Sequence, residues 1–250
     1  MTVRGELPNL RSAYALNGGL SLTGVPAPRH CSNAIRGAEG FNVGGLPLKL
    51  DFAVSLLEQI VVVRHGETVG QSSIRYYGAT DIALSGLGAD QVATAARAIG
   101  EQRFDLVVAS PLQRAWQSAR IVVPGEPIQL EPGFREIDFG HWEGLTKEEI
   151  EATDPSGYAQ WQREGIEFDF PGGETRVGFR ARVNAGLERL LTEPVRSMLI
   201  VAHKGIVRTV AERLSDAKLS VGQPELGGYV ELTRDPSNYD APWRIARSSF

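Results

Sequence analysis

From residue 59 onward, nearly solid runs of hydrophobic residues alternate with stretches in which hydrophobic positions recur at helical spacing. The runs at residues 60–63, 104–109 and 197–202 have the length and composition of strands that are covered on both faces, and residues 128–130 form a shorter one. Strands that alternate with helices in this way build a parallel sheet covered by helices. The pattern therefore predicts an α/β fold, a three-layer sandwich with a mostly parallel central sheet and helices on both faces.

The predicted helices begin at recognisable capping or turn residues. Ser85 has the side chain of an N-cap, and Thr146 and Glu149 have the spacing of a capping box. Ser110-Pro111 places a proline in a first turn, where its missing N–H is harmless. The expected elements are helices at 85–99, from 110 onward, at 146–152, after the turn at 171–175 and at 206–214, and an edge hairpin with arms at 229–233 and 243–246.

Residues 1–57 differ in composition from the rest of the chain. Glycine, proline, serine and asparagine are scattered through them, and the hydrophobic positions follow neither the period of a strand nor that of a helix. Such a segment buries too little apolar surface to offset the entropy of ordering. We therefore expect a low-complexity, disordered N-terminal extension at residues 1–57, with a misassigned start or a targeting segment as alternatives, and one domain at residues 58–250.

The bulk composition narrows the class of protein. The 250 residues carry a formal net charge of −4, 42% of them are hydrophobic, and Cys31 is the single cysteine. An acidic chain lacks the basic character of a general nucleic-acid binder, and a lone cysteine forms no internal disulfide. No hydrophobic run approaches the length of a membrane span, and no signal peptide follows Met1. These features predict a cytoplasmic enzyme with no nucleic-acid or membrane partner.

Charged and polar side chains follow three of the predicted strands at their carboxyl ends. Arg64-His65 follows the first strand, Ser110 leads from the second strand into a helix with Arg114, and His203 follows a later strand. Because the carboxyl ends of parallel strands meet at one edge of a sheet, we expect these side chains to surround one pocket. Two arginines and two histidines suit a dianionic group such as phosphate. A metal would need acids or thiolates that these strands lack, so we predict no metal and no cofactor.

With their neighbours, these residues resemble the histidine phosphatase superfamily, in its phosphoglycerate mutase-like branch. The resemblance extends from about residue 60 to residue 246 in the family's own order, and its wording is most similar to the small-molecule phosphatases of the superfamily, such as the α-ribazole phosphatases. Its motifs are Arg64-His65-Gly66-Glu67-Thr68, then Arg75 with Gly78 and Asp81, Ser110-Pro111-Leu112-Gln113-Arg114-Ala115, Arg135-Glu136-Ile137-Asp138-Phe139-Gly140, Trp142-Glu143-Gly144, Pro171-Gly172-Gly173-Glu174 and Ala202-His203-Lys204-Gly205.

The resemblance implies a role for each residue of the site. His65 would attack phosphorus and form a phosphohistidine, while Arg64, Arg114 and His203 would bind the phosphoryl oxygens. Glu136 would protonate the leaving oxygen and then take a proton from the attacking water. Four other acidic residues could serve as this acid instead, namely Glu67, Asp138, Glu143 and Glu174. Of these, Glu67 and Glu174 are expected to orient the arginines and a histidine of the site without contacting the substrate.

Five further residues are expected to contact the substrate. Arg75 and Gly78 belong to the family motifs, and Ser72 and Gln71 lie where the family often has an asparagine four residues after its motif glutamate. A phosphate contact at that place comes from Gln71 or Ser72, or is lost. Lys204 replaces a small residue that is common after the second histidine. The sequence does not decide whether its ammonium group faces the phosphate or points away.

The leading hypothesis is a metal-independent phosphomonoesterase that hydrolyses a small phosphorylated metabolite, as a monomer or a homodimer. One alternative is a phosphoglycerate mutase, against which the short interval between residues 144 and 171 argues. A second is a non-catalytic sensor of a phosphorylated ligand, although no catalytic residue is missing. The aromatic residues of that interval and its end, Tyr158, Trp161, Phe168 and Phe170, either form a lid over the substrate or pack into the core.

Overall fold

A six-stranded sheet with the order β3-β2-β4-β1-β5-β6 forms the centre of the structure, a computed structural model that describes residues 56–220 and 222–249. The predicted extension at residues 1–57 lies outside this part, apart from its last two residues. The strands are β1 (Gln59–Arg64), β2 (Leu106–Ala109), β3 (Gln129–Leu130), β4 (Ser197–Ala202), β5 (Tyr229–Thr233) and β6 (Arg244–Ser248). The predicted α/β class with a mostly parallel sheet is confirmed.

The register of the parallel strands brings distant segments to one edge of the sheet. β1 pairs with β4 from Gln59 opposite Ser197 to Arg64 opposite Ala202, and β2 and β3 continue the parallel part. β5 pairs antiparallel with β1, and β6 with β5. The predicted hairpin is therefore present, but of its two arms only β6 lies at an edge of the sheet. β5 lies between β1 and β6, and its consecutive buried residues show that both of its faces are covered.

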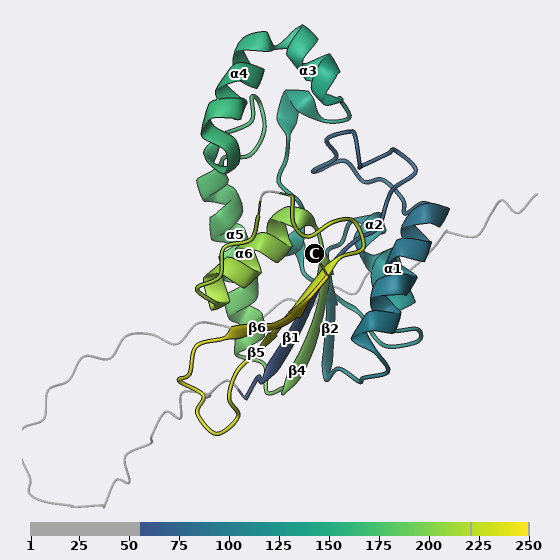
Figure 1. The fold of residues 1–250 in the computed structure, drawn as a ribbon, viewed down its shortest axis with the longest axis vertical. Coiled ribbons are helices and arrows are strands. Elements are labelled where there is room, and N and C mark those ends of the chain that lie inside the picture. The colour runs from purple at the N-terminus through teal and green to yellow at the C-terminus, as the bar shows by residue number, and fades with distance from the viewer. Residues whose placement is uncertain (1–55, 221, 250) are drawn as a thin grey trace, which may run out of the picture. The chain divides into compact units, whose positions relative to one another are not determined.

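Helices cover both faces of the sheet, as predicted (Figure 1). α1 (Gly86–Ile99) and α2 (Gln113–Val122) pack on one face against alternate strand residues such as Val61 and Val63. α5 (Arg176–Leu191) and α6 (Lys204–Leu214) pack on the other face against Ile60 and Val62. Successive side chains of a strand point to opposite faces, so each β-branched strand supplies both layers of the core. This explains why the strands read as solid hydrophobic runs.

The helix caps agree with the sequence in most places and differ at α2. Ser85 accepts a hydrogen bond from the Gly88 amide and caps α1, and Thr146 forms the predicted capping box. α2 begins at Gln113 instead of residue 110. The reason is that Asp81, from another loop, accepts a 2.7 Å hydrogen bond from the Gln113 amide. Ser110 therefore precedes the helix, and its hydroxyl oxygen accepts a hydrogen bond from the Leu112 amide at 3.3 Å.

Two helices extend beyond the carboxyl edge of the sheet, at the top of Figure 1. These are α3 (Lys147–Thr153), which was predicted, and α4 (Pro155–Glu164), which was not; the short 3-10 helices are η1 (Pro132–Phe134), η2 (Gly140–Trp142) and η3 (Gly165–Glu167). An aromatic cluster joins them to the body, with the rings of Trp142 and Phe168 stacked at 5.1 Å. Phe168 and Phe170 are buried in the core, so packing is part of their role. None of the described helices is long and apolar enough to cross a membrane.

Candidate active site

The carboxyl ends of β1, β2 and β4 bring the predicted site residues together. The His65 amide donates to the Ala202 carbonyl at 2.9 Å, and the Ser110 amide donates to the Val201 carbonyl at 3.0 Å. The rings of His65 and His203 then lie edge to face with their centroids 5.1 Å apart. A hydrogen bond of 2.8 Å joins Nε2 of His203 to Oγ of Ser110. The two histidines predicted from the sequence therefore share one buried site.

The hydrogen bond of His65 fixes its tautomer. Its Nδ1 lies 2.6 Å from the carbonyl oxygen of Gly66, and because a carbonyl only accepts, Nδ1 must carry the proton. Burial lowers the pKa of His65 well below 6.5, and the positive charges of Arg114 and Arg64 lower it further. The imidazole is thus neutral near pH 7, with the Nε2 lone pair available as a nucleophile. A Cβ at Gly66 would collide with the Gly88 carbonyl, so the close contact of these two backbone segments requires glycine at position 66.

Arg114 is fully buried, and its positive charge lowers the pKa of both histidines. Its guanidinium donates to the carbonyl oxygens of Thr80 at 2.8 Å, Gly78 at 2.7 Å and Tyr77 at 3.2 Å. Burial lowers the pKa of Arg114, and the nearby Glu136 charge acts in the opposite direction. Gly78 was predicted to contact the substrate, but the structure places its carbonyl on Arg114 and leaves it outside the pocket lining.

Glu143 shapes the loop that holds Arg114. Its carboxylate accepts hydrogen bonds from the amides of Gly78, Ala79 and Thr80 and from the Thr80 hydroxyl. A fourth amide, that of Phe139, donates to it at 3.0 Å. A carboxylate with this many donors is fully used by the backbone. Glu143 therefore acts on the site through Arg114 and does not face the substrate.

Arg64 and Glu136 face each other across the pocket. Arg64 donates from Nη1 to the Pro224 carbonyl at 2.8 Å, and burial lowers its pKa to about 10 against the opposing charge of Glu136. Glu136 is 8% exposed and accepts hydrogen bonds from the Ile137 and Gly205 amides, both at 3.0 Å. A Cβ at Gly205 would collide with this carboxylate. Both residues line the pocket, as predicted.

The rival acids predicted from the sequence are engaged elsewhere. Glu67 accepts hydrogen bonds from the Thr68 and Ser73 amides and shapes the loop after β1. Asp138 accepts from the amide of Gly140 in its own turn. Glu143 is used as described above, and Glu174 is paired with an arginine. Of the five acidic residues considered, Glu136 is the one that lines the pocket.

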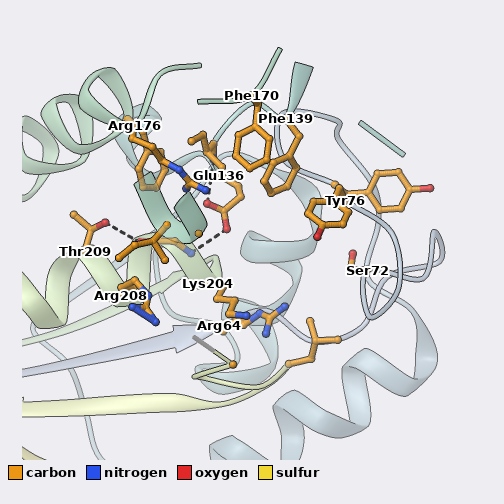
Figure 2. A pocket seen from close by; sticks show the side chains of 18 of the residues that line it. Arg64, Ser72, Tyr76, Glu136, Phe139, Phe170, Arg176, Lys204, Arg208 and Thr209 are labelled. Carbon is orange, nitrogen blue, oxygen red and sulfur yellow. Dashed lines mark hydrogen bonds between the residues drawn. The ribbon is translucent and has the colours of Figure 1, made fainter. Parts of the chain in front are cut away.

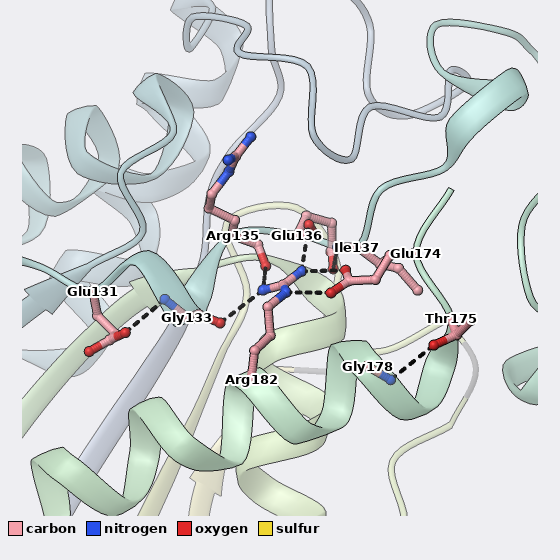
Figure 3. Close-up of polar contacts among 9 residues, drawn as sticks. All are labelled: Glu131, Gly133, Arg135, Glu136, Ile137, Glu174, Thr175, Gly178 and Arg182. Carbon is pink, nitrogen blue, oxygen red and sulfur yellow. Dashed lines mark hydrogen bonds and ion pairs between the residues drawn. The ribbon is translucent and has the colours of Figure 1, made fainter. Parts of the chain in front are cut away.

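That arginine, Arg182 of α5, was missed by the sequence reasoning (Figure 3). It donates to both oxygens of Glu174 at 2.7 Å. Its remaining bonds reach the carbonyl oxygens of Gly133, Arg135 and Glu136 at 2.9, 2.6 and 3.0 Å. The pair therefore fixes the backbone that carries Glu136. No local motif distinguishes Arg182 from the other arginines of its helix, so its role could not be predicted from the sequence.

The pocket has a volume of about 1250 Å³ and is bounded by cations on one side and aromatic rings on the other (Figure 2). Among the predicted binding residues, Arg64, Ser72, Arg75 and Lys204 line it, whereas Arg114 and His203 are fully buried and lie outside its lining. The Arg75 guanidinium is occupied by Glu149, with Nη–Oε distances of 2.8 and 3.3 Å. Gln71 is exposed and outside the lining, and its φ of 64° places it in a tight turn.

Two cations of the pocket were left open or missed by the sequence reasoning. Lys204 faces inward and lies next to Arg64 (Figure 2), and burial followed by the Arg64 charge lowers its pKa to about 8. Arg176, at the start of α5, was not predicted. Its guanidinium lies over the Phe170 ring at 4.8 Å and reaches the lining next to Glu136. An arginine that follows a turn belongs to no sequence motif that would mark it as part of a site.

Three buried nitrogen atoms of the site have no hydrogen-bond partner in the described part of the chain. They are Nε of Arg64, Nε of Arg114 and Nδ1 of His203. Buried polar groups without partners are rare in native proteins, and such groups often mark the place of a ligand. A phosphoryl group offers several acceptor oxygens and a double negative charge. The same three residues are those predicted to hold it.

Comparison with known proteins agrees with this arrangement. A family model described as the histidine phosphatase superfamily (branch 1) matches residues 60–234. The glucosyl-3-phosphoglycerate phosphatase of Mycobacterium tuberculosis is 34% identical over 184 residues, covering 68% of this chain and 80% of the relative. The structure of a mycobacterial glucosyl-3-phosphoglycerate phosphatase aligns with a TM-score of 0.60 at 30% identity, over 76% of this chain and 97% of the other. The structure of the α-ribazole phosphatase of Shigella flexneri aligns with a TM-score of 0.64 at 25% identity, over 75% of this chain and 95% of the other.

The chain belongs to the histidine phosphatase superfamily, branch 1. The relatives described above are named as phosphatases of small molecules. The predicted recognition of this family is therefore confirmed, and so is the prediction of a phosphoric monoester hydrolase that acts on a phosphorylated metabolite.

Proposed function

We propose that this enzyme hydrolyses its phosphate ester in two displacements at His65. The observation that carries the proposal is the set of unpaired nitrogen atoms on Arg64, Arg114 and His203, buried beside a neutral imidazole. Donors that are already in place stabilise the charge of a transition state without reorganisation, and removing one typically costs about 3–4 kcal/mol of barrier.

In the first displacement, Nε2 of His65 bonds to phosphorus while the bond from phosphorus to the ester oxygen breaks. Glu136 gives its proton to that oxygen, and the alcohol leaves. In the second displacement, water bonds to phosphorus, Glu136 takes a proton from it, and the bond between phosphorus and His65 breaks. Inorganic phosphate is released, and both residues return to their starting forms. Apart from the substrate and one water molecule, these steps use only side chains of this chain.

The test is turnover of p-nitrophenyl phosphate in the presence of a metal chelator. We expect the wild type to be active and His65→Ala to lose activity by at least about a thousandfold, because the covalent route is closed. His141→Ala is the matched control, since His141 is exposed and outside the pocket lining. Full activity of His65→Ala would refute the proposal. Isomerisation of phosphoglycerate that depends on a bisphosphate primer would favour the mutase alternative instead.

Three further expectations belong to this proposal. A cytoplasmic location is supported by the single cysteine of the chain. Binding of nucleic acid is disfavoured by the net charge of −4. A monomer or a homodimer is expected, and sedimentation would distinguish them.

A further inference from the structure

The second histidine of the site is followed by a lysine whose ammonium group is unpaired. Lys204 is the first residue of α6, its side chain is half-buried, and it lines the pocket. Within residues 56–220 and 222–249, this ammonium group makes no hydrogen bond and no ion pair. Three arginines of the lining, in contrast, are neutralised by neighbouring acids, as the ion pairs of Arg75, Arg180 and Arg208 show. The charge of Lys204 is therefore available to a ligand.

The fold places this ammonium group beside Arg64. β1 and β4 are neighbours in the sheet, with Arg64 opposite Ala202, so the residue two positions after Ala202 reaches the same edge of the sheet. Figure 2 shows the side chain of Lys204 next to that of Arg64. Arg64 donates from Nη1 to the Pro224 carbonyl, while its buried Nε has no partner in the described part of the chain. Two neighbouring cations thus line the pocket with unused donors.

Two adjacent positive charges repel each other, and an anion in contact with both removes this repulsion. Burial, followed by the charge of Arg64, lowers the pKa of Lys204 to about 8. The Glu136 carboxylate opposes this effect, but its two oxygens already accept hydrogen bonds from the amides of Ile137 and Gly205. A phosphoryl group has the charge and the several acceptor oxygens that an ammonium group with three donors requires.

We propose that Lys204 binds the phosphoryl group that is transferred to His65, as a further cation beside Arg64. This inference rests on the proposed function and adds a catalytic residue to it. The ammonium group offsets negative charge on the phosphoryl oxygens in both displacements, because these oxygens stay in place while the alcohol leaves and water enters. The contribution of Lys204 is therefore the same whichever alcohol leaves.

Inorganic phosphate tests this contact without a leaving group. Its inhibition constant, Ki, is measured against p-nitrophenyl phosphate in the wild type and in Lys204→Met, which removes the charge and keeps the aliphatic part of the side chain. We expect Ki to rise by at least about tenfold, which is the loss of one hydrogen bond between charged groups. Lys204→Arg keeps a cation, and its Ki should lie between the two. Lys218→Met is the matched control, because Lys218 is an 84% exposed lysine at the rim of the pocket.

Esters of different alcohols show whether Lys204 contacts the phosphoryl group or the leaving group. The esters are p-nitrophenyl phosphate, glycerol 3-phosphate and 3-phosphoglycerate, of which the last carries a carboxylate on its alcohol. We expect Lys204→Met to lower kcat/KM for all three by at least about tenfold, with factors that agree within about threefold. A loss confined to 3-phosphoglycerate would place the ammonium group on the leaving alcohol and would overturn the inference.

The pH profile gives a readout that a structural role of Lys204 would not change. The charges that act on its ammonium group are those of Arg64, Arg208, Glu136 and Lys147. The ammonium group is charged at pH 7 and loses its proton as the pH rises through about 8. The kcat/KM of the wild type for p-nitrophenyl phosphate, whose leaving group needs no proton from Glu136, should therefore fall above that pH toward the value of Lys204→Met. The variant should lack this fall, and Lys204→Arg should show it only at higher pH.

Three results would overturn the inference besides a loss confined to 3-phosphoglycerate. The first is a Ki of phosphate that Lys204→Met leaves unchanged. The second is the same alkaline fall in the wild type and in Lys204→Met. If Lys204→Met does not fold, the third decides, namely an identical alkaline fall in the wild type and in Lys204→Arg. Failure of the proposed function is distinguishable, because it would appear as activity that persists in His65→Ala, whatever the Ki of phosphate.

Discussion

The Arg182 guanidinium holds the loop that carries Glu136, and replacing it should weaken both the fold and the reaction. Arg182→Met keeps the aliphatic stem but leaves Glu174 unpaired and removes donors from the Gly133, Arg135 and Glu136 carbonyls. A hydrogen bond to a charged group contributes about 1.5–3 kcal/mol. Arg182 and Glu174 are 28% and 23% exposed, so water recovers part of this loss. We expect a net loss of about 3 kcal/mol in the free energy of unfolding.

The assay is a double-mutant cycle in urea unfolding with Arg182→Met, Glu174→Gln and the double variant. We expect losses of about 3, 1.5 and 3 kcal/mol, hence a coupling energy of about 1.5 kcal/mol. Arg180→Met is the matched control on the same helix, because its pair with Glu167 is 42% and 59% exposed and should contribute less than about 0.5 kcal/mol. Additive losses for Arg182 and Glu174 would refute the reasoning.

The same variant separates positioning from simple stability. The activity is measured without urea, at a temperature where Arg182→Met is fully folded. There we expect its kcat for an alkyl phosphate to be about tenfold lower than that of the wild type, because the backbone carbonyl of Glu136 is no longer held. KM should change little, since the phosphoryl donors remain in place. An unchanged kcat would show that Arg182 supports only the fold.

Three other predictions follow from the site. Glu136→Gln should reduce turnover of alkyl phosphates about a hundredfold more than that of p-nitrophenyl phosphate, whose leaving group needs no proton; equal losses would contradict its role as the acid. His65 and His203 have pKa values lowered well below 6.5 by burial. Below pH 6.5 the unfolded chain therefore binds more protons than the folded chain. As the pH is lowered from there, the free energy of unfolding should fall by up to about 1.4 kcal/mol per pH unit for each imidazole. A flat urea-unfolding profile from about pH 7 to pH 5 would contradict this. Gly66→Ala should destabilise the fold by about 3 kcal/mol, because its Cβ meets the Gly88 carbonyl, and an unchanged melting temperature would show that the loop yields.

The parts of the fold that were predicted are those with a local physical signal. The strands are buried on both faces, so each reads as a hydrophobic run, and the caps at Ser85 and Thr146 use the side chains that capping requires. α4 was missed because none of its residues is fully buried. Its pattern is weak without the aromatic cluster that holds it. The start of α2 depends on Asp81, which is distant in sequence.

The site divides in the same way. His65 and His203 were predictable because each follows a strand and the register of the sheet brings strand ends together. Arg182 and Arg176 were not, since their roles arise from what the fold places beside them. Gly78 shows a third case: a motif marks it, but the structure uses its carbonyl to hold Arg114 and a Cβ there would collide with the Ile137 carbonyl.

The proposed mechanism requires that the phosphoryl group passes through a covalent bond to the imidazole at position 65. Rapid quenching with alkali, followed by phosphorus NMR of the denatured protein, detects this covalent bond directly. We expect a phosphoramidate signal that is stable to alkali, lost in acid, absent from His65→Ala and present in His141→Ala. The proposal would be contradicted by a wild type that hydrolyses its ester without a burst and without phosphoramidate at any time. A phosphoramidate signal that survives in His65→Ala would contradict it as well.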